Sequence, residues 1–190
     1  MGFNITGDPA ADRVLDESPF ALLVGMLLDQ QHPMEHAFRV PARLRDRLGT
    51  LDPGVIAASD PDELAEICAR TPAVHRFPGS MATRLQELAQ AVENEYDGDT
   101  SRLWSEAGSG RELVRRVQAL PGFGQQKARI FVALLAKQLD VRPEGWEEAV
   151  GDYALAGHRS VADVTDPASL RQVREHKKQQ KAAARAGDGG

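Results

Sequence analysis

Two glycines one residue apart mark the segment of the sequence whose residue types best suit the binding of a ligand. Gly122 and Gly124 lie in the string Leu120-Pro121-Gly122-Phe123-Gly124-Gln125-Gln126-Lys127, between two stretches with helical apolar spacing. Glycines in so tight a connection leave backbone N–H groups uncovered, and the following helix adds its own unpaired N–H groups and the positive end of its dipole. The string therefore predicts a phosphate-binding hairpin, although the same glycines also fit an ordinary turn between two helices.

The elements that must position this hairpin are predicted to be helices. Apolar residues at helical spacing precede and follow the string: Leu113, Val114 and Val117 on one side, Ile130, Phe131, Leu134 and Leu135 on the other. A capping residue followed by proline recurs elsewhere and predicts helix starts at Ser18-Pro19, Asp52-Pro53, Asp60-Pro61 and Asp166-Pro167. Further helices are predicted from Pro33 to Gly49 and from Pro78 to Tyr96. Alternating β-branched segments are almost absent, so the sequence predicts an all-α fold.

Charge is spread unevenly along the 190 residues. The formal net charge is −5, but residues 171–190 carry +4 and the preceding 170 residues carry −9. Because lysine and arginine contacts to phosphates supply most non-specific DNA affinity, the acidic part argues against broad polyanion binding, and any nucleic-acid site must be local. We interpret the basic end as a solvated, fraying helix end in preference to a dedicated DNA arm.

Composition excludes several other classes. Because Cys68 is the single cysteine, the chain cannot form an intrachain disulfide, a zinc site with only cysteine ligands or a cysteine-ligated iron–sulfur cluster. The longest apolar run, Phe20 to Leu28, is about half of what a membrane-spanning helix needs, and the first residues lack the basic start of a secretory signal. We expect a monomer in the cytoplasm that makes no membrane contact.

Three segments carry a resemblance to a known family. The hairpin string Leu120 to Gly124 is similar to the hairpin of the helix-hairpin-helix DNA glycosylases, the superfamily of endonuclease III and of the adenine and alkyladenine glycosylases. The segment 19–31 resembles that family's early helix, which ends in a leucine-rich run and a glutamine, and 77–85 is similar to the helix before the hairpin. The three matches follow the family's order.

The resemblance implies roles for individual residues. The hairpin residues Pro121 to Lys127 would contact DNA, their amides gripping a phosphate, in many relatives through a bound monovalent cation; no other cofactor is expected. Gln31 would fill the gap left by a flipped base, since the glycosidic bond is inaccessible inside the stack. The partner implied is double-stranded DNA with a damaged or mispaired base.

Departures from the family pattern are equally informative. Bifunctional members place a nucleophilic lysine two residues after the second glycine, where this chain has Gln126. Lys127 lies about 100° further around the helix, so we expect it to face a phosphate or solvent, and lyase chemistry is not expected. The family's catalytic aspartate falls on Glu144, with Asp140 and Asp152 as alternatives. Each of these acids also fits the simpler interpretation of a solvated loop charge.

One tryptophan and two histidines are further candidates. Trp146, next to Glu144 in the chain, could line a base pocket, although core packing is the safer interpretation. His32 and His36 are spaced as a helical pair, but no third ligand is apparent, so no metal site is expected.

The sequence thus predicts a two-lobed helical glycosylase domain over residues 1–170, with the hairpin motif at about 110–138, followed by a basic helix end and frayed tail at 171–190. The function expected is a monofunctional DNA glycosylase of base excision repair. Two alternatives stay open: a non-catalytic protein of the same fold that binds DNA lesions or structures, and a helical protein-interaction domain.

Overall fold

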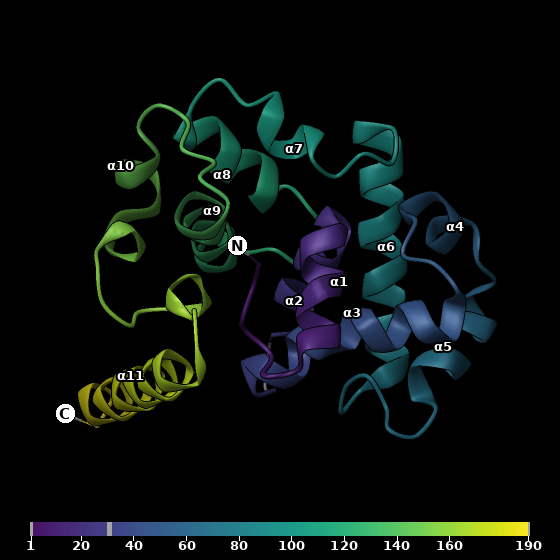
Figure 1. Ribbon diagram of the computed structural model, residues 1–190, viewed down its shortest axis with the longest axis horizontal. Coiled ribbons are helices and arrows are strands. Elements are labelled where there is room, and N and C mark those ends of the chain that lie inside the picture. Colours follow the sequence, from purple (N-terminus) through teal and green to yellow (C-terminus); the bar gives the residue numbers. More distant parts are fainter. Residues whose placement is uncertain (1, 30–31, 190) are drawn as a thin grey trace.

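The computed structural model of the chain describes residues 2–29 and 32–189. Over these residues the secondary structure consists of helices, and no strand is present (Figure 1). The α-helices are α1 (Pro9–Glu17), α2 (Pro19–Leu28), α3 (Met34–Leu48), α4 (Pro53–Ala58), α5 (Pro61–Ala69), α6 (Pro78–Tyr96), α7 (Arg102–Ser105), α8 (Gly110–Gln118), α9 (Gln125–Gln138), α10 (Trp146–Val150) and α11 (Pro167–Gly187). Two short 3-10 helices, η1 (Gly151–Ala154) and η2 (Val161–Asp163), connect α10 to α11. The all-α prediction is confirmed.

Helix starts follow the capping chemistry read from the sequence. The Ser18 hydroxyl accepts a hydrogen bond from the Ala21 N–H at 3.2 Å, and the Asp52, Asp60 and Asp166 carboxylates cap their helices in the same manner. At its C-terminal end α3 stops at Gly49, which adopts a left-handed backbone with φ of +78°. Helix α1 begins with the same signature, Asp8 before Pro9, and was not among the predicted helices.

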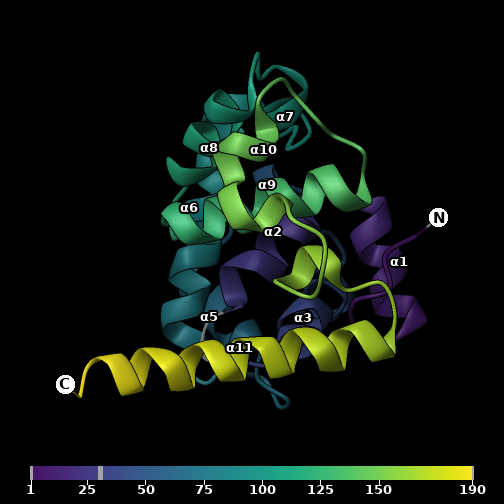
Figure 2. The ribbon, with the colours of Figure 1, turned by 90° about the vertical axis from the view of Figure 1, so that its left-hand side faces the viewer.

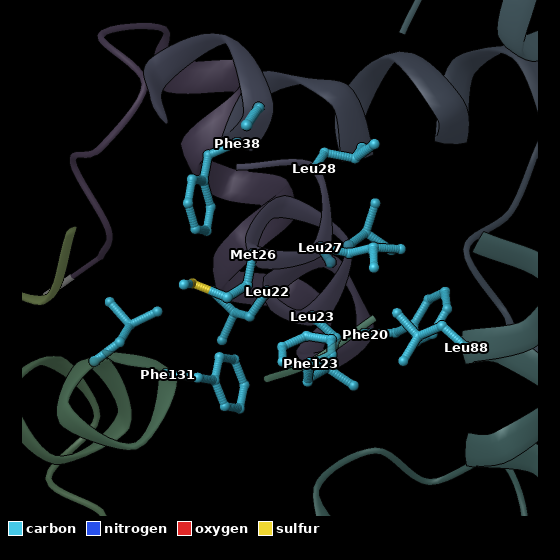
Figure 3. Packing of buried hydrophobic residues seen from close by; sticks show 14 of the residues in the cluster. Phe20, Leu22, Leu23, Met26, Leu27, Leu28, Phe38, Leu88, Phe123 and Phe131 are labelled. Carbon is cyan, nitrogen blue, oxygen red and sulfur yellow. The ribbon is translucent and has the colours of Figure 1, made fainter. Parts of the chain in front are cut away.

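Helix α2 is the centre of the structure. Every residue from Phe20 to Leu28 is buried, so this helix is apolar on all sides, as expected for a helix enclosed by others. Side chains from α3, α6, the hairpin and α9 gather around it, among them Phe38, Leu88, Phe123 and Phe131 (Figure 3). The apolar cluster is continuous from the first helices to α9 and η2. Helix α2 therefore joins the α3–α6 group to the α7–α10 group.

Helix α11 runs along one edge of the molecule (Figure 2). It is anchored near its start by the buried Val173. From Lys178 to Asp188 every residue is exposed. The C-terminal end of the helix projects beyond the other elements (Figure 2). The structure has helix through Gly187, whereas we expected this end of the chain to fray.

Candidate nucleic-acid interface

The hairpin is formed by α8, residues 119–124 and α9. Ser109 caps α8, accepting a hydrogen bond from the Glu112 N–H at 3.1 Å. Leu120 and Phe123 point into the core, where the Phe123 ring meets Phe131 edge-on at a centroid distance of 6.3 Å. These two apolar anchors fix the turn on the body of the protein, so of Phe123 only the backbone is available to a ligand.

The two hairpin glycines have different structural roles. Gly122 adopts φ of +83°, and a Cβ there would clash with the Leu27 Cδ1 of α2. Gly124 has an ordinary φ, and apart from its chain neighbours no atom of the described residues lies within 4 Å of the position its Cβ would take. Gly122 is thus required for the turn and its close approach to α2, whereas Gly124 leaves open space in front of the α9 N-terminus.

That N-terminus presents backbone donors outward. Gly124 is the N-cap of α9, and among the described residues no side chain caps it. The first N–H groups of a helix lack partners inside the helix and carry its positive dipole end, which favours an anion. Gly124, Gln125 and Gln126 are all exposed. Geometry and electrostatics here suit a phosphate.

The two glutamines face different neighbours. The Gln126 amide nitrogen donates to the Tyr153 hydroxyl of η1 at 3.0 Å. Gln125 lines an open groove along the outer face of the hairpin with a volume of about 600 Å³. The groove is also lined by the three cations Arg111, Arg115 and Arg129 and by the acids Glu144 and Glu148.

Lys127 does not face solvent or an open phosphate site, contrary to the expectation from the sequence. Its half-buried amine donates to the Leu27 carbonyl at 2.9 Å and lies 5.8 Å from the Phe123 ring centroid. Burial lowers the pKa of Lys127 from 10.5 to about 8, with nearby Arg84 adding to the effect and Asp29 opposing it. Lys127 therefore ties α9 to the C-terminal end of α2.

The same end of α2 also meets α11. Lys177 lies 3.5 Å from the Asp29 carboxylate, whose side chain is 8% exposed, and Arg174 pairs with Glu35 of α3 at 2.9 Å. Burial raises the pKa of Asp29, while Lys177 and then Lys127 oppose that shift. Sequence reasoning missed both ion pairs, because nothing local links α11 to residues some 140 positions earlier.

The three candidate acids lie in different places. Asp140 is at the C-terminal end of α9, roughly 20 Å from the hairpin at 1.5 Å per residue, and pairs with Arg142 at 3.2 Å. Glu144 lines the groove on the Gln125 face of the hairpin. Asp152 precedes Tyr153, the partner of Gln126. All three carboxylates are exposed.

The remaining predicted residues stand as follows. Trp146 is half-buried, and its backbone packs so closely on Gly110 that a Cβ on Gly110 would clash with the Trp146 Cα. The His32 ring lies 5.6 Å from His36 and 5.5 Å from His75, and no metal-binding group of three or more ligands is found over residues 2–29 and 32–189. Gln31 lies outside the described residues.

An uncapped helix N-terminus behind a glycine hairpin, set on an all-α body, defines a protein of the helix-hairpin-helix class. Residues 24–187 match the sequence model of the HhH-GPD superfamily base excision DNA repair protein, and the chain belongs to that family. The resemblance inferred from the sequence is thereby confirmed. No curated protein and no solved structure gives a significant match. None of the helices in the described part is long and apolar enough to cross a membrane.

Proposed function

We propose that this protein is a monofunctional DNA glycosylase, which hydrolyses the N-glycosidic bond of a damaged or mispaired base in double-stranded DNA. The observation that carries the proposal is the uncapped N-terminus of α9 behind Gly124, with open space in front of it. Family membership supports a DNA substrate, since the family is one of base excision repair proteins.

The hairpin would hold one phosphate through backbone donors. The N–H groups of Gly124, Gln125 and Gln126 would bind the phosphate oxygens, and the helix dipole would favour the negative charge. A monovalent cation fits the donor chemistry of this exposed turn, whose backbone carbonyl oxygens are the ligands that such an ion prefers. It would supply charge neutralisation between the turn and the phosphate.

Two features support hydrolysis without lyase chemistry. The position of the family's nucleophilic lysine holds Gln126, an amide that cannot form an imine and that donates to Tyr153. Lys127 has a lowered pKa, but its amine is engaged with the Leu27 carbonyl. The expected product is an intact strand with an abasic site.

Asp152 is our preferred catalytic carboxylate. It adjoins the Gln126 and Tyr153 pair, and so shares the surroundings of the family's lysine position, whereas Glu144 lies on the Gln125 face and Asp140 at the other end of α9. A carboxylate there would stabilise positive charge developing on the sugar and activate a water molecule. Gln31 stays our candidate for the residue that fills the vacated stack. Trp146 is partly buried against the apolar core, which favours a structural role over base stacking.

The phosphate site is tested by Gly124→Val, because the added side chain would occupy the space in front of the α9 amides, and its Cβ meets no atom of the described protein within 4 Å apart from the chain neighbours. We expect duplex binding to fall at least tenfold at unchanged helix content. Gly79→Val in the first turn of α6 is the matched control, since a Cβ there also meets open space among the described residues. Equal affinity of parent and Gly124→Val would contradict the hairpin assignment.

The chemistry is tested with duplexes that carry different lesions, scored for alkali-labile sites. Excision should produce strands cut only after alkali, and borohydride should trap no protein–DNA adduct. Asp152→Asn should slow excision by orders of magnitude with DNA binding preserved, while Asp140→Asn and Glu144→Gln should not. A trapped adduct would contradict monofunctional action, and full activity of Asp152→Asn would remove that residue from the mechanism.

A second candidate function is binding of DNA lesions without catalysis. It is favoured by the exposure of Asp140, Glu144 and Asp152, because charge stabilisation is strongest where water is excluded. Binding without excision on every lesion, under conditions where another glycosylase acts, would support it.

A further inference from the structure

The C-terminal segment of the chain has a net positive charge, and most of its cations lie on one side of α11. Residues 171–190 carry +4, against −9 for the rest of the chain. At about 100° per residue, Arg171, Arg174, Lys178, Lys181 and Arg185 fall within an arc of roughly 80° on this 21-residue helix. We call these five residues the α11 stripe. Because α11 is helical through Gly187, the five residues of the stripe lie on one continuous helix.

The ion pairs described above fix the orientation of the stripe. Arg174, a member of the stripe, contacts Glu35, and the adjacent Lys177 contacts Asp29 at the end of α2. The first turn of α9 reaches the same place, since Lys127 donates to the Leu27 carbonyl. Lys127 of α9 and Lys177 of α11 therefore both reach the end of α2, one at the Leu27 carbonyl and the other at the Asp29 carboxylate.

Beyond this junction the stripe is free. Lys178, Lys181 and Arg185 are exposed, and they extend along α11 for roughly 10 Å at 1.5 Å per residue. The C-terminal end of α11 projects past the other elements (Figure 2). These three cations are therefore accessible to a ligand.

The rest of this exposed segment does not suit a protein groove or a lipid surface. Both would require large apolar side chains at helical spacing. From Lys178 to Ala186 the other positions are alanine or glutamine, namely Gln179, Gln180, Ala182, Ala183, Ala184 and Ala186, and Gly187 and Asp188 follow. A helix with a cationic face and no apolar face is suited to bind a polyanion.

We propose that Lys178, Lys181 and Arg185 form a second binding surface for the phosphate backbone of duplex DNA, apart from the hairpin. The proposal rests on the proposed function in so far as the duplex is the ligand of the hairpin. Because the remainder of the chain is acidic, this surface supplies sequence-independent attraction that the body lacks. It contacts backbone only, so its contribution is the same for damaged and undamaged duplexes.

The test replaces Lys178, Lys181 and Arg185 together by glutamine in the full chain. Binding of a labelled 25-base-pair duplex is followed by fluorescence anisotropy over a range of salt concentrations, with and without an abasic-site analogue. We expect affinity to fall roughly tenfold for both duplexes. The slope of log K against log salt should become shallower by about 0.9 for each phosphate that no longer meets a cation.

A control variant keeps the net charge and moves the cations. The replacements at 178, 181 and 185 are combined with Gln180→Lys, Ala183→Lys and Ala184→Arg, which puts the charges on the opposite side of α11. We expect this variant to bind as weakly as the neutralised one. Binding as tight as that of the parent would overturn the proposal, because the net charge of α11, and not the position of its cations, would then account for DNA affinity.

Gly124→Val separates this proposal from the proposed function. If Gly124→Val weakens binding and the neutralised α11 does not, the hairpin stands and the α11 surface is overturned. If only the neutralised α11 weakens binding, the α11 surface stands and the hairpin assignment falls. A parent protein that binds no duplex overturns both.

Discussion

Lys127 shows how a single residue can serve the fold in place of the chemistry that its type suggests. Its amine exchanges water for the Leu27 carbonyl and the face of the Phe123 ring, and this burial lowers its pKa to about 8. A lowered pKa is common among catalytic amines, but here the geometry accounts for it without catalysis. The hydrogen bond instead holds the N-terminal turn of α9, and therefore the hairpin, against α2.

The lowered pKa has a consequence for stability. Between pH 8 and 10.5 the folded protein has released the Lys127 proton while the unfolded chain still holds it, so this residue makes the unfolding free energy rise with pH over that window. The stabilisation by the neutral amine is complete above the pKa of the unfolded chain, and it is lost as the pH falls through the pKa of the folded protein. Lys127→Met should remove that rise, which is at most about 1.4 kcal/mol per pH unit for one proton.

Urea unfolding of parent and variant at several pH values measures the difference. Comparison is needed because burial raises the pKa of Cys68 to about 11, which acts in the opposite direction. Lys178→Met on exposed α11 is the control and should leave the pH dependence of the parent unchanged. An unaltered pH dependence in Lys127→Met would contradict the burial of the amine.

At the scale of the element, α11 is held by apolar burial and by ion pairs. Its Val173 is buried in the core, and its Arg174 and Lys177 pair with Glu35 and Asp29 near the end of α2. The Glu35 side chain is 11% exposed, and its Oε2 has no hydrogen-bond partner among the described residues. Arg174 is thus the principal compensation for a nearly buried carboxylate.

Removal of that arginine should therefore cost more than an ordinary surface substitution. We expect Arg174→Met to lower the unfolding free energy by about 1–3 kcal/mol, toward the lower value because Arg174 is itself half exposed. Arg171→Met, on the same side of the helix, is exposed and should change it by less than about 0.5 kcal/mol. Glu35→Gln should recover part of the loss in the Arg174→Met background. Chemical denaturation of the four proteins checks this, and equal stability of the two single arginine variants would contradict it.

The sequence predicts helices better than it predicts their contacts. Capping residues followed by proline identify where helices start, because the signal is local, and Asp8-Pro9 carried it for α1 as well. The hairpin was predictable for the same reason. By contrast, the Lys127 contact with Leu27 and the α11 ion pairs join residues 100 or more positions apart, and no local pattern specifies them. The path from α9 to α11 was also not predictable. It is fixed by the burial of Val150, Val161 and Val164 in the shared core, and no local pattern specifies that packing.

For the whole molecule, the central position of α2 predicts that both groups of helices unfold together. Leu23 is fully buried in the middle of α2, and Leu23→Ala should lower the unfolding free energy by about 2–5 kcal/mol. Trp104 and Trp146 both lie in the α7–α10 part, so their fluorescence reports that part while circular dichroism reports all helices. The two unfolding transitions should coincide in parent and variant. Leu155→Ala, at an exposed position, is the control, and separate transitions would contradict a shared core.

The pairing of α11 with the end of α2 also orders events during biosynthesis. Glu35 leaves the ribosome long before Arg174, which follows it by 139 residues. Until α11 is translated, the nascent chain holds two carboxylates at the end of α2 without the cations that neutralise them in the folded protein. Because a domain generally folds as a unit, the two ion pairs form only after α11 has left the ribosome. A chain that ends before α11 therefore lacks the ion pairs of Glu35 and Asp29, and so do ribosome-bound chains that have not yet reached α11.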